Sequence, residues 1–155
     1  MTQLRNYRFQ SIWYVDVGPD VVFDVLRDIS TYRSWWPEIK DVWRIDDETA
    51  DVRARSFLPY DLRFMMARSR DDRDAGVLEV SMTGDLEGFS RFTITPSDGG
   101  SRIVFDEHVV TNKKLLNWLA PLARPAFRFN HTLMMRHGLA GLKTYLAGFR
   151  RASAS

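Results

Sequence analysis

The sequence predicts an α+β domain in which one strand and two short helices precede six antiparallel strands and a long C-terminal helix. Three observations predict this order. A helix-start signal, Gly18-Pro19-Asp20, follows the first strand-like segment. Turn-forming clusters rich in Asp, Gly and Pro then separate short apolar segments through the middle of the chain. An apolar stripe at helical spacing runs through the last thirty or so residues before the C-terminus.

The N-terminal part predicts a strand followed by two helices. RFQSIWYVDV, residues 8–17, has the composition of a strand. Pro19 suits the first turn of a helix, and VVFDVLRDI carries apolar residues at helical spacing. STYRSWW predicts a second short helix with Ser30 as its N-cap, ended by Pro37.

The middle of the chain predicts an antiparallel meander. The turn clusters DDETAD, LPYD, DDRDAG, GDLEG and SDGG supply Asx-turns and positive φ angles. Six segments of strand length lie between and beside them, and turns this short connect antiparallel neighbours. These predicted strands cover residues 39–45, 52–58, 62–70, 77–83, 89–95 and 101–111.

The C-terminal helix is predicted from about Pro125 to Arg150, because Pro121 and Pro125 argue against one unbroken helix from residue 114. Helical spacing places one set of mostly apolar residues on a single face: Phe127, His131, Met134, Gly138, Leu142, Tyr145 and Phe149. His137 lies towards the edge of that face. Six residues apart, His131 and His137 cannot hold a metal as an i, i+4 pair does, so no metal site is predicted.

The composition excludes several classes of protein. The chain has 155 residues, enough for one domain with one core. Its net charge is +2 with scattered basic residues, so no nucleic-acid partner is expected. The absence of cysteine excludes disulfides and thiol catalysis. Without a signal peptide or an apolar run long enough to span a membrane, we expect a cytoplasmic protein with no integral membrane segment.

Two stretches carry a family resemblance: WYVDVGPDVVFDVLRDISTYRSWWPEIKDV and FRFNHTLMMRHGLAGLKTYL. They resemble the START-like, birch-pollen-allergen superfamily (SRPBCC), especially its polyketide cyclase/dehydrase-like branch. The resemblance implies a single domain over residues 1–155 with the helix-grip fold, in which a curved seven-stranded antiparallel sheet wraps around the long C-terminal helix. It also implies a cavity between sheet and helix. Members bind lipids, sterols, hormones or polyketides, and some cyclise or dehydrate polyketide chains.

Two ionisable residues are candidates for chemistry in that cavity. Alternation in SRIVFDEHVVT places Glu107 on the same, inward face as Ile103, Phe105 and Val109, where a carboxylate needs a partner. Arg91 is a possible partner, although alternation leaves its face undecided. His131 has two interpretations: a buried structural imidazole, or a polar group at the cavity wall that binds or activates a ligand.

The remaining candidate ligand-binding residues are mostly aromatic or flexible. Trp36 is interpreted as the cavity mouth or as part of a seal at one end of the core, and the Met side chains as an adaptable lining or as core filler. Gly138 either permits close packing or leaves volume for a ligand. The full predicted set is Trp36, Trp43, Phe64, Met66, Met82, Arg91, Phe105, Phe127, Met134 and Gly138.

These observations favour a protein that binds a hydrophobic or aromatic small molecule, such as a lipid or polyketide. The alternative is a polyketide cyclase or dehydratase that uses Glu107 and His131 as acid and base. A third interpretation is a lipid or quinone carrier for a partner complex. No motif for a cofactor or a metal is present, and we expect a monomer or a homodimer.

Overall fold

A single curved sheet and one long helix make up most of the molecule, as the computed structural model shows for residues 6–55, 60–112 and 120–154. All seven strands are antiparallel, in the order β1-β7-β6-β5-β4-β3-β2. The strands are β1 Asn6–Val15, β2 Ile39–Arg44, β3 Thr49–Ala54, β4 Leu62–Asp72, β5 Val77–Gly84, β6 Leu86–Ser97 and β7 Gly100–Thr111. The helices are α1 Pro19–Arg27, the 3₁₀ turn η2 Ile29–Thr31, α2 Tyr32–Trp35 and α4 Ala120–Ala154. The predicted helix-grip fold is confirmed.

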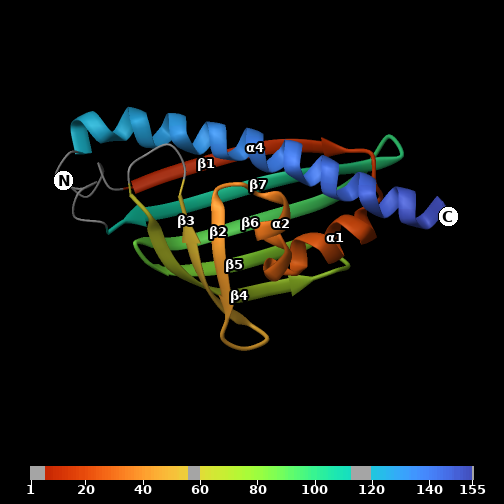
Figure 1. Ribbon diagram of the computed structural model, residues 1–155, viewed down its shortest axis with the longest axis horizontal. Helices are drawn as coiled ribbons and strands as arrows, with labels where there is room; N and C mark the ends of the chain where they lie inside the picture. Colours follow the sequence, from red (N-terminus) through yellow and green to blue (C-terminus); the bar gives the residue numbers. More distant parts are fainter. Residues whose placement is uncertain (1–5, 56–59, 113–119, 155) are drawn as a thin grey trace.

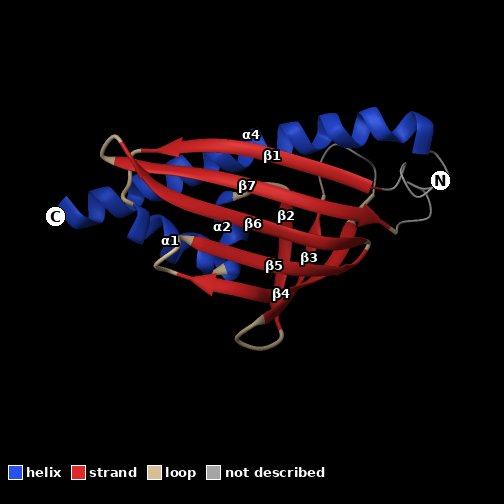
Figure 2. Ribbon diagram, turned by 180° about the vertical axis from the view of Figure 1, so that it is seen from behind, coloured by secondary structure: helices blue, strands red, loops and turns tan. Residues whose placement is uncertain are grey.

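The helices all lie on one face of the sheet. In Figure 1, α4 runs along the strands of this face, and α1 and α2 lie beside its C-terminal half. Figure 2 shows the opposite face, with the sheet in front of the helices. The space between the sheet and α4 is therefore the place where apolar side chains from both layers meet.

The first two helical segments follow the sequence prediction with one correction. α1 begins with Pro19 at its first turn, as expected. The second segment is a 3₁₀ turn followed by the short α2, and Ser30 is not its N-cap. The carboxylate of Asp28 does the capping instead, since it accepts hydrogen bonds from the Ser30 N–H at 3.1 Å and from the Ser30 hydroxyl at 2.5 Å.

α4 begins at Ala120, five residues before the predicted start, and contains Pro125. The prediction of a start at Pro125 was therefore wrong. Pro125 lies in the second turn of α4, so the helix forms without the backbone hydrogen bond from position 125 to the carbonyl of residue 121. The described helices lack the long apolar run that a membrane-spanning segment requires.

Alternation along β7 sets the inner face of the sheet as predicted. Ile103 and Val109 are fully buried and Phe105 nearly so, so that Glu107 shares their inward face. Leu142 of α4 is also fully buried. Each buried aliphatic side chain of this kind stabilises the fold by about 1.5–3 kcal/mol. Phe149, predicted on the same helix face, is 43% exposed.

Two glycines let α4 approach α2 very closely. A Cβ atom on Gly141 would lie 1.7 Å from the carbonyl oxygen of Trp35, and one on Gly138 would lie 2.7 Å from the indole of Trp36. The same indole donates a hydrogen bond from Nε1 to the Met134 carbonyl at 2.9 Å. The missing side chain of Gly138 is therefore used for helix–helix packing, which favours the close-packing interpretation of this residue over that of free volume for a ligand.

Candidate functional site

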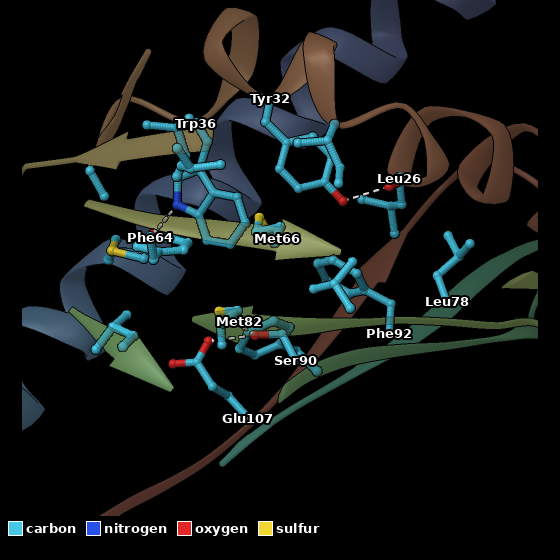
Figure 3. Close-up of a pocket in the computed structure, with 18 of the residues that line it drawn as sticks. Leu26, Tyr32, Trp36, Phe64, Met66, Leu78, Met82, Ser90, Phe92 and Glu107 are labelled. Carbon is cyan, nitrogen blue, oxygen red and sulfur yellow. Dashed lines mark hydrogen bonds between the residues drawn. The ribbon is translucent and has the colours of Figure 1, made fainter. Parts of the chain in front are cut away.

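A cavity of about 100 Å³ lies between the inner face of the sheet, α4 and the α1–α2 segment (Figure 3). Its walls come from strands β2 to β7 and from these helices, and they are predominantly apolar. The apolar lining residues are Leu26, Ile29, Tyr32, Trp36, Ile39, Val42, Val52, Ala54, Leu62, Phe64, Met66, Leu78, Val80, Met82, Leu86, Phe92, Phe105, Phe127 and Met134.

The two polar aromatic groups of the wall have their donors occupied. The Tyr32 hydroxyl donates to the Leu26 carbonyl at 2.5 Å, and the Trp36 indole donates to the Met134 carbonyl (Figure 3). Burial raises the pKa of Tyr32 well above its ordinary value. These two side chains therefore offer a ligand their apolar faces rather than a hydrogen bond.

One group of polar side chains in the cavity wall surrounds the carboxylate of Glu107. One carboxylate oxygen accepts a hydrogen bond from the Ser90 hydroxyl at 2.8 Å, and the other lies 3.4 Å from Nε2 of His131. The side chains of Glu107 and His131 are 11% and 8% exposed. Asn130 joins them in the lining. We refer to Ser90, Glu107 and His131 as the polar cluster.

His131 is held in position by ring stacking. Its imidazole stacks on Phe9 with ring centroids 3.6 Å apart and an angle of 8° between the planes. The ring of Phe105 is a second neighbour, with its centroid 6.2 Å away. Among the described residues, Nε2 of His131 has no hydrogen-bond partner although it is buried. A buried nitrogen in that state costs free energy, so it is a natural position for a polar group of a ligand.

Most of the predicted site residues line this cavity. The structure brings together Trp36, Phe64, Met66, Met82, Phe105, Phe127 and Met134 with Glu107 and His131. Their roles in binding or catalysis stay predictions. Asn130 lies well inside α4 and also contributes to the wall.

Arg91 is a correction to the predicted site. Alternation along β6 turns Ser90 and Phe92 towards the cavity, so Arg91 points to the outer face of the sheet. There it donates to Glu79 at 2.7 Å. Arg91 therefore does not partner Glu107. The Ser90 hydroxyl donates a hydrogen bond to this carboxylate instead.

Trp43 is a second correction. Its side chain is 54% exposed on the outer face of β2, while its neighbour Val42 lines the cavity. The predicted ligand-binding set placed Trp36 and Trp43 together. Strand alternation separates them instead, because Trp35 and Trp36 belong to α2 and its C-cap and Trp43 to an outward position of a strand.

Ser90 and Arg68 are two polar residues among the lining residues that the sequence did not predict. Ser90 occupies the same face as Phe92 and Ile94, and this alternation was visible in FSRFTIT. Arg68 follows Phe64 and Met66 at a spacing of two along β4, which also predicts an inward position. Its side chain is only 13% exposed and lines the cavity.

A polar groove of about 550 Å³ adjoins the cavity on the side of α1 and the β2–β3 turn. The two hollows share Arg27, Ile29, Val42 and Arg68 in their walls. Arg68 therefore lies where the apolar interior meets a polar groove.

Comparison with known proteins gives one family match. The family model described as "Polyketide cyclase / dehydrase and lipid transport" matches residues 9–147. No curated protein matches the sequence.

Solved structures with the same fold are numerous, at low sequence identity. The Zhui aromatase/cyclase from Streptomyces sp. R1128 has a TM-score of 0.76 at 13% identity, covering 90% of this chain and 93% of that one. A START superfamily protein from Mycobacterium smegmatis has a TM-score of 0.72 at 16% identity, covering 92% and 98%. TTHA0849 from Thermus thermophilus has a TM-score of 0.71 at 13% identity, covering 90% and 99%. Similarities at these identities establish the fold alone.

Proposed function

The chain belongs to the polyketide cyclase/dehydrase and lipid transport family, and from this premise we propose that it binds a small hydrophobic or aromatic molecule between the sheet and α4. The observation that carries the proposal is the cavity itself: a mainly apolar space whose wall includes the buried polar cluster, with an unsatisfied His131 nitrogen. Burial of apolar surface supplies the affinity, and the few polar groups fix the orientation.

The volume of the cavity limits the size of the ligand. Cavities that hold drug-sized molecules measure roughly 300–1,000 Å³, and this cavity measures about 100 Å³. A single-ring or short-chain molecule therefore suits the observed conformation. Larger molecules require side chains of the wall to move, and the unbranched side chains of Met66, Met82 and Met134 rotate most readily.

The polar cluster determines which group of the ligand points inward. A ligand hydroxyl donates to the Glu107 carboxylate, in competition with the Ser90 hydroxyl that already binds one of its oxygens. His131 Nε2 completes the contact from the other side. A ligand with a hydroxyl or carbonyl oxygen at its inner end can form hydrogen bonds with the polar cluster. Without a ligand, Nε2 of His131 is buried and lacks such a bond among the described residues.

Native mass spectrometry of the freshly purified chain tests this proposal, followed by extraction and identification of the retained molecule. We expect a retained mass in the wild type and in Trp43→Phe, whose side chain lies outside the cavity. We expect its loss in Ser90→Phe, which fills the cavity, with circular dichroism to verify that the variant folds. The proposal is wrong if no molecule is retained and a panel of hydrophobic compounds leaves the melting temperature unchanged.

A second candidate function is an aldol cyclisation, favoured by the carboxylate of Glu107 lying 3.4 Å from the His131 imidazole inside the cavity. The Glu107 carboxylate takes a proton from the carbon next to a ligand carbonyl, and His131 stabilises the enolate oxygen. The enolate carbon then attacks a second carbonyl carbon, whose oxygen receives the proton.

Two substitutions test the cyclase function against a matched control. Glu107→Gln and His131→Ala should each abolish turnover of a poly-β-ketone substrate, while Arg91→Gln on the outer face should not. If both cavity variants retain wild-type turnover, the catalytic function is excluded and ligand binding alone remains.

A further inference from the structure

Arg68 and Glu107 lie in one row of side chains that crosses the sheet. The strand register pairs Arg68 with Val80, Val80 with Ser90, and Ser90 with Glu107. All four residues line the cavity. Three strand spacings of about 4.8 Å place the two ends of the row roughly 14 Å apart at Cα. The cavity thus has a cation at one end of the row, a carboxylate at the other, and a mainly apolar wall beside it.

The side chain of Arg68 is 13% exposed, and its guanidinium makes one hydrogen bond within the described residues. Its Nη2 donates to the Arg27 carbonyl at 3.0 Å. Its Nη1 lies 3.6 Å from a carboxylate oxygen of Glu48 and 3.6 Å from one of Asp71, too far for a good hydrogen bond. Because a guanidinium has five N–H donors, most of its hydrogen-bonding capacity is unused among the described residues.

The present partners of Arg68 differ in how firmly they are held. Asp71 accepts a hydrogen bond from Arg27 at 2.6 Å. Glu48 belongs to the β2–β3 turn, and its side chain is 60% exposed with no other ion pair among the described residues. Its backbone carbonyl accepts a hydrogen bond from the Arg68 N–H at 2.8 Å, so the turn stays in place when the carboxylate moves. The Glu48 carboxylate is therefore the exchangeable partner.

We propose that Arg68 binds the carboxylate of an amphipathic ligand that lies along this row, with its chain or ring in the cavity and a hydroxyl at Glu107. This inference rests on the proposed binding function and specifies the class of ligand: a hydroxylated carboxylic acid of moderate length. The planar fork of a guanidinium matches a carboxylate with two parallel hydrogen bonds. The ligand carboxylate displaces that of Glu48, which turns into the groove.

Three eight-carbon probes test the proposal by calorimetry at pH 7.5: octanoate, 1-octanol and 8-hydroxyoctanoate. We expect octanoate to bind at least about 10-fold more tightly than 1-octanol, as a charge-assisted hydrogen bond implies. 8-Hydroxyoctanoate should bind more tightly than octanoate, because its hydroxyl reaches the polar cluster.

Three variants assign the selectivity to Arg68. Arg68→Met should weaken octanoate binding by about 10-fold and leave 1-octanol within about twofold. Arg63→Met is the matched control, since Arg63 is an exposed residue of the same strand, and it should change neither affinity. Glu48→Gln removes an exposed competitor without disturbing the core, so it should strengthen octanoate binding.

The outcomes separate this inference from the function on which it rests. Equal affinity of the wild type for octanoate and 1-octanol overturns the role of Arg68 and leaves a binder of neutral molecules. If Arg68→Met still binds octanoate more tightly than 1-octanol, the proposed role of Arg68 is also overturned. If neither probe binds and no molecule is retained after purification, the proposed binding function fails as well.

Discussion

Replacing three glycines of α4 by alanine, one at a time, measures how closely this helix approaches α2. In a helix interior, alanine is favoured over glycine by about 1 kcal/mol. Gly148 has no atom near the position of an added Cβ, so Gly148→Ala should stabilise the protein by about 0.5–1 kcal/mol. It is the control for the other two substitutions, because it has the same chemical change without the steric one.

Gly141→Ala should have the opposite effect. Its Cβ would lie 1.7 Å from the Trp35 carbonyl oxygen, which is part of the backbone and cannot rotate away. Non-bonded heavy atoms prefer about 3.5 Å, so α4 has to retreat by roughly 1.5–2 Å. Such a shift breaks the hydrogen bond from Trp36 to Met134 in addition to the overpacking strain. We expect a net loss of about 3 kcal/mol.

Gly138→Ala should lie between these extremes. Its Cβ would meet the Trp36 indole at 2.7 Å, and a ring tilts more easily than a backbone carbonyl moves. A net loss of about 1 kcal/mol is expected. Urea unfolding followed by circular dichroism gives the three free energies of unfolding. A Gly141→Ala protein as stable as Gly148→Ala would refute the close approach of α4 to Trp35.

Three further predictions concern the core, a tyrosine and a buried carboxylate. Phe105→Ala should lower the free energy of unfolding by about 3–5 kcal/mol and enlarge the cavity; benzene should then raise the melting temperature of the variant more than that of the wild type. Burial raises the pKa of Tyr60 to about 12, so stability present below pH 10 should fall as the pH rises from 10 to 12. Tyr60→Phe should lessen this fall, and an identical alkaline profile in both proteins would contradict it. His137→Ala removes the 2.5 Å partner of the buried Glu38 carboxylate and should cost about 1–2 kcal/mol, partly restored by adding Glu38→Gln, as urea unfolding would show.

Much of the fold was predictable because its signals are local. All seven strands, α1 and the long C-terminal helix were predicted near their observed positions, since turn chemistry and side-chain periodicity depend on neighbours in sequence. The capping by Asp28 and the earlier start of α4 were not predicted. Both depend on which of several adjacent residues forms a bond, and composition does not distinguish them.

The candidate site was predictable wherever alternation decided the face of a strand. Glu107 was correctly placed inward because three apolar neighbours share its face, and the same rule applied to FSRFTIT or LRFMMARSR would have placed Ser90 and Arg68 inward. The function of Gly138 was not predictable. It depends on Trp36, about a hundred residues away in sequence, and only the tertiary structure brings the two together.

The pairing of β1 with β7 has a consequence for how this protein is made. β1 is an edge strand whose hydrogen-bonded neighbour, β7, lies about a hundred residues later in the chain. During synthesis, the apolar side chains of Tyr7, Trp13 and Val15 therefore emerge from the ribosome long before their strand has a partner. Contacts between such distant segments form slowly, because a long loop must close first. The nascent chain is thus exposed to aggregation through its first strand until β7 has been translated.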